Sequence, residues 1–95
     1  MIYHFSLSPN AENDLLEAAL WYENQQTGLG EKFIKKVESY FLRIQNHPFH
    51  FPLKKGNLRE VYIQKFPYVI IYQIIVDHII VFAVFNIHQN PTKKP

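Results

Sequence analysis

Hydrophobic positions are densest between residues 68 and 85 of the chain. Residues 68–75 and 79–85 carry β-branched and aromatic side chains at nearly every position, without the alternation that a half-buried strand shows. This pattern is typical of central strands that are covered on both faces. The break at Val76-Asp77-His78 predicts a tight turn, so we expect two adjacent strands of one sheet.

A block of helical periodicity follows Ser8-Pro9. We expect a helix from Pro9 to about Gln26, because the Ser8 side chain can cap the first turn and proline suits the first helical position. Its apolar positions recur at helical spacing, at Ala11, Leu15, Ala18, Ala19 and Tyr22. We expect Trp21 and Tyr22 to pack against the sheet or the second helix, and contact with a ligand is the alternative.

A second helix is expected over residues 29–46. Gly28 marks the turn before it, and Pro48 ends it because the residue that precedes a proline disfavours helix. Its buried stripe would be Phe33, Val37, Phe41 and Ile44. The connection between the two helices is short, so they should form an antiparallel hairpin.

Two further strands are expected over residues 2–7 and 58–65, with a loop over residues 47–56. The resulting order, β-α-α-β-β-β, predicts an α+β fold in which the helical hairpin packs on one face of an antiparallel sheet. We expect a single domain over residues 1–91 and a frayed C-terminal tail over residues 92–95.

The second face of this sheet lacks an obvious cover. It would present one alternate set from the strand 68–75, either Val69, Ile71, Gln73 and Ile75 or Tyr68, Ile70, Tyr72 and Ile74. An exposed apolar area of that size normally marks an interaction site. Sheet curvature and the loop aromatics Phe49 and Phe51 are the alternative way to fill it. We expect a protein built to receive a partner.

Composition narrows the class of protein. The 95 residues include no cysteine, which excludes disulfides and thiolate zinc sites. His47 and His50 lack a third ligand, so we expect no metal and no cofactor. The first residues do not resemble a signal peptide, and Gln73, Asp77 and His78 interrupt the apolar run. We expect a cytoplasmic protein that does not interact with a membrane.

Charge is unevenly distributed along the chain. Residues 1–50 carry four basic and six acidic side chains, whereas residues 51–95 carry six basic and two acidic ones. Such a dipolar surface could steer an anionic partner, or be ordinary solvated surface. A strong nucleic-acid binder usually has a denser basic patch.

Several short motifs, taken in order, resemble one family. They are Leu7-Ser8-Pro9, Trp21-Tyr22, Gly28-Leu29-Gly30-Glu31-Lys32-Phe33, Asn46-His47-Pro48, Leu58-Arg59, Phe66-Pro67-Tyr68 and Asn90-Pro91. Together with the order of elements, they make nearly the whole chain similar to the RelE/ParE superfamily, the toxins of type II toxin–antitoxin modules. The chain looks most like the ParE branch, often labelled plasmid stabilisation proteins.

This resemblance implies a small toxin that a cognate antitoxin holds inactive by wrapping around it. It also implies two different activities. RelE-like members are ribosome-dependent endoribonucleases that cut mRNA without a metal, whereas ParE-like members bind and poison DNA gyrase. A degenerate, non-toxic member is a third reading.

The residues favour the binding activity over the nuclease. Metal-free RNA cleavage needs a base, an acid and cations that stabilise the phosphorane. The nuclease branch typically has arginine directly after the position of Tyr68, where this chain has Val69. Arg59, Lys65 and His88 remain as candidate catalytic residues, so whether the chain is an enzyme stays open.

The resemblance also suggests where an antitoxin or target binds. The candidate contact residues are Tyr68, Ile70, Tyr72, Arg59, Lys54 and Lys55. Aromatic core filling is the alternative role of the two tyrosines, and a solvated turn is the alternative for the two lysines.

Overall fold

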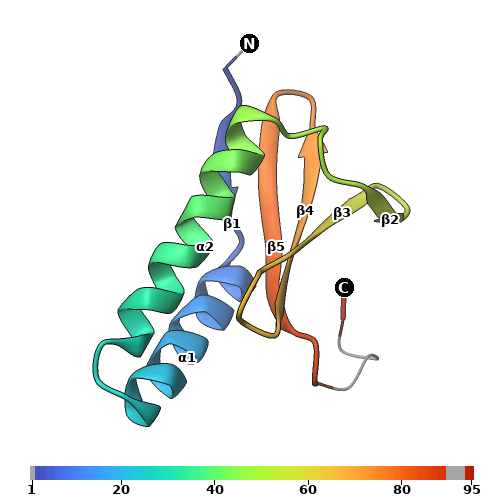
Figure 1. Cartoon of the computed structure of the whole chain (residues 1–95). Helices are drawn as coiled ribbons and strands as arrows, with labels where there is room; N and C mark the ends of the chain where they lie inside the picture. Colours follow the sequence, from blue (N-terminus) through green and yellow to red (C-terminus); the bar gives the residue numbers. More distant parts are fainter. Residues whose placement is uncertain (1, 90–93) are drawn as a thin grey trace.

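The computed structural model describes residues 2–89 and 94–95, and the elements follow one another as two helices and five strands (Figure 1). Their bounds are β1 (His4–Leu7), α1 (Pro9–Gln25), α2 (Leu29–Asn46), β2 (Leu53–Lys55), β3 (Leu58–Tyr62), β4 (Tyr68–Ile75) and β5 (His78–Asn86). The two helices lie side by side on one face of the sheet. This arrangement confirms the expected α+β class.

Both helices begin where their capping groups lie. The hydroxyl oxygen of Ser8 accepts a 3.0 Å hydrogen bond from the backbone N–H of Ala11, and Pro9 occupies the first position of α1. The carboxylate of Glu23 accepts hydrogen bonds of 2.9 and 3.0 Å from the N–H groups of Gly28 and Gly30. Glu23 on α1 therefore caps the start of α2, where a negative charge also suits the helix dipole.

The five strands form one sheet in the order β1-β5-β4-β3-β2. The pairing of β1 differs from expectation, because β1 runs parallel to β5 while the other pairs are antiparallel. A parallel pair needs a long crossover connection, and the helices together with β2, β3 and β4 provide it. The expected loop 47–56 also contains β2, which a turn at Gly56 (φ 57°) folds back onto β3.

The helix-facing side of the sheet holds the main core. Ile70 and Tyr72 of β4 pack there with the buried stripe of α2, and Tyr68 and Ile74 lie partly buried at its margins. The opposite face, here called the outer face, carries Val69, Ile71, Ala83 and Phe85, with Leu58 packed against them. The sheet therefore has two hydrophobic clusters of unequal size.

The expectation of an open apolar face requires correction. Val69 and Ile71 point to the outer face, yet both are 0% exposed. Tyr62 stands directly opposite Val69 and Glu60 directly opposite Ile71 in β3, and side chains at such cross-strand positions contact one another. Side chains of the same sheet therefore help to cover Val69 and Ile71, which sequence reasoning had left open. Ile75, at the end of β4, remains exposed.

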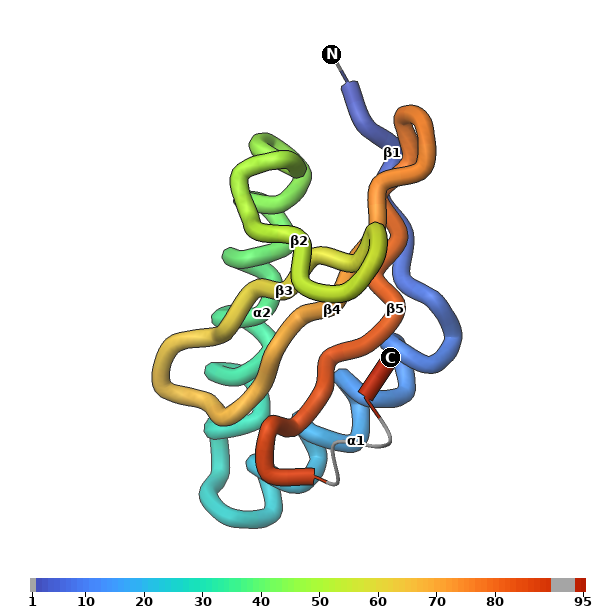
Figure 2. The backbone as a smooth tube through the Cα atoms, turned by 90° about the vertical axis from the view of Figure 1, so that its right-hand side faces the viewer, coloured from blue at the N-terminus to red at the C-terminus, as the bar shows by residue number. Residues whose placement is uncertain are grey.

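Residues 90–93 lie outside the described part of the chain, and with them the motif Asn90-Pro91 and half of the expected tail. Lys94 and Pro95 are described and lie against the outer face (Figure 2). No helix among residues 2–89 and 94–95 has the length and apolar character needed to cross a membrane.

Candidate functional site

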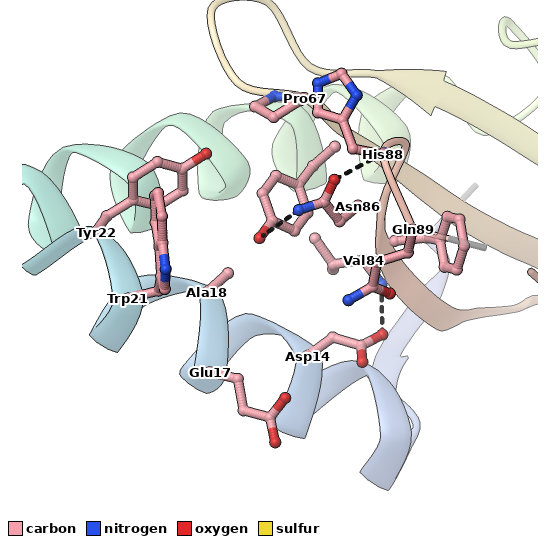
Figure 3. A pocket seen from close by; sticks show the side chains of 12 residues that line it. Asp14, Glu17, Ala18, Trp21, Tyr22, Pro67, Val84, Asn86, His88 and Gln89 are labelled. Carbon is pink, nitrogen blue, oxygen red and sulfur yellow. Dashed lines mark hydrogen bonds between the residues drawn. The ribbon is translucent and has the colours of Figure 1, made fainter. Parts of the chain in front are cut away.

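A pocket of about 540 Å³ opens between α1 and the end of β5 (Figure 3). Its wall includes Asp14, Glu17 and Trp21 from α1, Tyr68 at the start of β4, and Asn86 and His88 at the end of β5. We call this the α1–β5 pocket. It combines carboxylate, phenol, amide and imidazole groups on a partly apolar wall.

The first turns of α1 complete the edge of β5 where β1 stops. The last paired residue of β1 is Leu7, opposite Val81. Beyond it, a carboxylate oxygen of Asp14 accepts a 3.1 Å hydrogen bond from the N–H of Val84, and the Asn10 amide donates to the carbonyl of Phe82 at 3.2 Å. Side chains of the helix therefore replace a strand at this edge, which satisfies the backbone groups.

Burial raises the pKa of the Asp14 carboxyl above its usual value, and the charge of Glu17 raises it further, while the hydrogen bond from Val84 opposes both effects. Burial likewise raises the pKa of the Tyr68 phenol, opposed by the hydrogen bond with Asn86. The Asn86 amide donates to the Tyr68 oxygen at 3.4 Å and accepts from the His88 N–H at 2.8 Å. Asn86 thus links the pocket floor to the exposed turn that carries His88.

Trp21 is a pocket residue for which the sequence had favoured a packing role over contact with a ligand. Tyr22 packs as expected, with ring centroids 5.1 Å from both Phe33 and Phe66. Trp21 is instead 57% exposed at the pocket rim. Consecutive helical residues point about 100° apart, so two neighbours rarely face one core together. This periodicity was the available signal.

The structure does not bring the three candidate catalytic residues together. The Arg59 guanidinium donates to the Phe51 carbonyl at 2.6 Å and lies 5.2 Å from the centre of the Phe49 ring. Arg59 lies opposite Tyr72 of β4, whereas the last residue of β5 lies opposite Tyr68 at the start of β4. These two positions of β4 are four residues, or about 13 Å, apart. His88 lies beyond that end of the sheet.

Lys65 lies in the exposed turn between β3 and β4, at the same end of the sheet as His88. Arg59 is therefore separated from the other two candidates, and its guanidinium holds the chain segment that leads into β2.

A family model described as the ParE toxin of the type II toxin–antitoxin system, parDE, matches residues 5–91. The chain belongs to the ParE toxin family. This confirms the resemblance drawn from the ordered motifs.

A solved structure supports the fold of this ParE-family chain. The chromosomal ParDE toxin–antitoxin system from P. aeruginosa superposes with a TM-score of 0.77 at 13% identity, over 92% of this chain and 98% of the other. At that identity the likeness shows the fold alone. No curated protein sequence matches the chain.

Two of the candidate contact residues of this ParE-family chain require correction. Ile70 and Tyr72 are buried in the core that faces the helices and have no surface to offer a partner. Their positions in β4 face α2, which the sequence pattern alone could not distinguish from the outer face. Lys54 and Lys55 lie exposed in the edge strand β2, and Tyr68 lines the α1–β5 pocket.

Metal ligands form no cluster in the described ranges of this ParE-family chain. Among residues 2–89 and 94–95, no group of three or more His, Cys, Asp or Glu side chains could hold a metal ion. His47 and His50 lie exposed after the end of α2.

Proposed function

We propose that the chain is a cytoplasmic toxin that a cognate antitoxin neutralises and that acts by binding a cellular target such as DNA gyrase. The observation that carries this proposal is the separation of Arg59 from His88. Arg59 is engaged by the carbonyl of Phe51, and the nuclease alternative would need both residues at one phosphate.

The charge of the α1–β5 pocket supports the same proposal. His88, a candidate acid or base, shares this pocket with the carboxylates of Asp14 and Glu17. Two negative charges repel the phosphates of an RNA strand and attract a basic protein segment. The pocket therefore suits a peptide better than a nucleic acid.

The outward side of α1 supplies apolar contact area next to that pocket. Leu16, Leu20 and Trp21 are 62%, 65% and 57% exposed, and the first two lie one helical turn apart. Exposed apolar groups of this kind mark interaction surfaces, and tryptophan is enriched among residues that dominate binding energy. A partner segment with apolar and basic side chains would fit this surface.

Growth of a bacterial host after induction tests the mode of action. The wild-type chain should arrest growth, and a Lys65→Ala variant should arrest it equally, because Lys65 is exposed in the turn between β3 and β4 and lies outside the α1–β5 pocket. Loss of arrest in this variant, at equal abundance, would contradict target binding and support the nuclease. If the wild-type chain does not arrest growth in a host whose gyrase it can bind, the chain is a degenerate, non-toxic member of the family.

Two biochemical assays identify the target and the contact surface. Purified chain should trap gyrase–DNA complexes and should not cut mRNA in a translating extract. Trp21→Ala should weaken antitoxin or gyrase binding by about tenfold or more, whereas Leu42→Ala, an equally exposed change on α2, should not. Equal binding by the two variants would exclude the α1 surface.

A further inference from the structure

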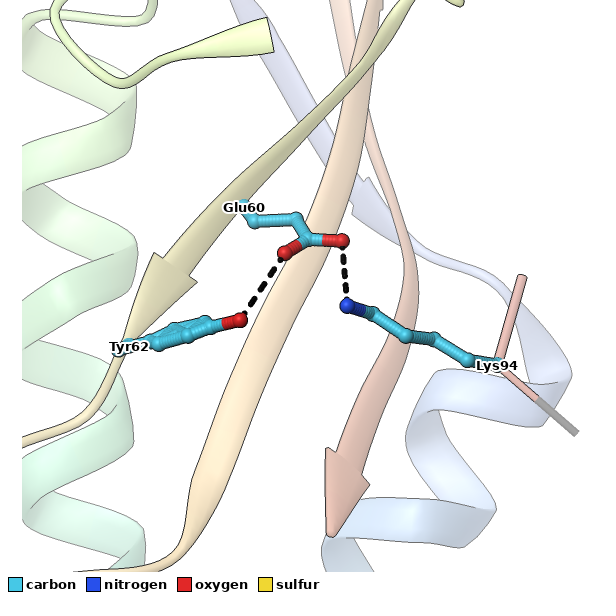
Figure 4. Close-up of polar contacts among 3 residues, drawn as sticks. All are labelled: Glu60, Tyr62 and Lys94. Carbon is cyan, nitrogen blue, oxygen red and sulfur yellow. Dashed lines mark hydrogen bonds and ion pairs between the residues drawn. The ribbon is translucent and has the colours of Figure 1, made fainter. Parts of the chain in front are cut away.

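The outer face of the sheet carries a buried carboxylate. Glu60, in the middle of β3, is 8% exposed. One of its oxygens accepts a 3.3 Å hydrogen bond from the Tyr62 hydroxyl, and the other lies 2.8 Å from the Lys94 ammonium nitrogen (Figure 4). A carboxylate removed from water needs a cation close by, and the far end of the same chain supplies it here.

Lys94 and Pro95 occupy only part of a longer depression. On one side of them a groove of about 460 Å³ extends past Tyr62 to Lys54 and Lys55 of β2. On the other side a groove of about 620 Å³ runs past Leu58, Gln73 and Phe82 to the start of α1. The outer face thus offers a path for an extended segment longer than the two residues seated on it.

The site that Lys94 and Pro95 occupy favours a segment with one ammonium group next to an apolar residue. Glu60 accepts a single ammonium group, and the groove beside Pro95 is largely apolar, since it includes Leu58, Phe82 and Pro9. The ion pair also raises the pKa of Lys94, chiefly through its hydrogen bond with Glu60. When Lys94 leaves this site, Glu60 loses its cation. A segment that replaces it must therefore bring an ammonium group of its own.

We propose that the outer face around Glu60 is a docking site for an extended peptide segment that carries a lysine followed by a proline or another apolar residue. In the free protein Lys94 and Pro95 occupy this site and compete with such a partner. The site lies on the opposite side of the sheet from the helices and does not depend on the identity of the toxin's target.

The probe is a synthetic peptide, Asn-Pro-Thr-Lys-Lys-Pro amide, titrated into the full-length ¹⁵N-labelled chain and followed by NMR. Wild-type chain should bind it weakly, because its own segment holds the site. Lys94→Ala should bind it about tenfold more tightly if that segment is seated about nine-tenths of the time. Shift changes should concentrate at Leu58, Glu60 and Gln73. The matched control, Lys65→Ala, removes one exposed lysine elsewhere and should bind like wild type.

Two further arms test the role of the carboxylate. In the Lys94→Ala background, Glu60→Gln should weaken peptide binding by about tenfold or more, because an amide cannot neutralise the ammonium group. A peptide with norleucine in place of the second lysine should lose affinity to the same extent on unchanged Glu60. This second arm decides the question if the Glu60→Gln variant does not fold. Equal affinity of both peptides, or of wild type and Lys94→Ala, would overturn the proposal.

Discussion

The hydroxyl group of Tyr72 donates a hydrogen bond of 2.6 Å to the carbonyl oxygen of Pro48, a residue 24 positions away along the chain. Both residues are buried. The bond ties the segment after α2 to the central strand β4, just beside the carbonyl groups that Arg59 holds. Tyr72 is therefore a structural residue that fixes the path from the helical hairpin into the sheet.

Replacing Tyr72 by phenylalanine should lower the free energy of unfolding by about 1–3 kcal/mol, because the buried carbonyl of Pro48 loses its donor. Urea denaturation measures this change. Tyr62→Phe is the control, since Tyr62 is half exposed and its hydroxyl makes only a long hydrogen bond of 3.3 Å to Glu60. Equal losses in the two variants would contradict the structural role of the buried bond.

The same hydroxyl should make stability sensitive to alkaline pH. Burial raises the pKa of Tyr72 from 10.0 to about 12, and the charge of Arg59 opposes this effect. The folded chain therefore keeps a proton that the unfolded chain releases. This contribution to stability is complete below pH 10 and is lost as the pH rises to about 12. Between these values the unfolding free energy of wild type should fall more steeply than that of Tyr72→Phe. If the unfolding free energies of the two proteins change with pH in parallel, the pKa of Tyr72 is not raised.

Val76, at the tip of the β4–β5 hairpin, is a strained residue. Its φ of 58° lies in the left-handed region, and the residue is 90% exposed. A β-branched side chain is disfavoured there, whereas glycine is not. Val76→Gly should raise the free energy of unfolding by roughly 1 kcal/mol, measured by urea denaturation. Val76→Ala, which keeps a Cβ atom, should gain less. A destabilised glycine variant would show that the valine conformation is not costly.

Gly30 lets the two helices approach closely. A Cβ atom there would lie 2.5 Å from the carbonyl oxygen of Ala19 and 3.0 Å from a carboxylate oxygen of Glu23. Gly30→Ala should therefore destabilise the chain by roughly 1–3 kcal/mol, despite the better helix propensity of alanine. Thermal unfolding would show a lower midpoint. Lys32→Ala, an exposed change in the same turn, should alter stability by less than about 0.5 kcal/mol.

Asp14 should make stability decline as the pH rises through the acidic range. Its pKa is raised from 3.8 by burial, so the folded chain binds the proton more tightly than the unfolded chain. The free energy of unfolding therefore falls as the pH rises from 3.8 through the higher pKa that Asp14 has in the folded chain. Asp14→Asn keeps an oxygen that can accept from Val84 and should lack this decline. Chemical denaturation of both proteins across the acidic range checks the prediction, and identical slopes would contradict it.

The elements themselves were largely predictable because they depend on neighbouring residues. Ser8 and Pro9 began α1 where the sequence placed its start, and α2 ended before Pro48. The two apolar runs became β4 and β5. β2 was missed because three exposed residues carry no hydrophobic alternation, and only pairing with β3 makes them a strand.

The candidate site was harder to predict than the fold. Tyr68 and His88 were chosen from the sequence, and both line the α1–β5 pocket, but Asp14 and Trp21 join them only because α1 crosses the end of β5. Ile70 and Tyr72 were assigned to the surface because a strand that is apolar at nearly every position has too little pattern to distinguish its faces.

By itself the sequence determined the helical hairpin, the two central strands and the ParE-type order of elements, because capping, periodicity and turn residues act over a few neighbouring positions. Tertiary structure alone decided that β1 joins β5 in parallel, that Glu60 is buried and meets Lys94, and that Arg59 turns toward Phe51. Each of these depends on contacts between residues far apart in the chain, which local preferences do not encode.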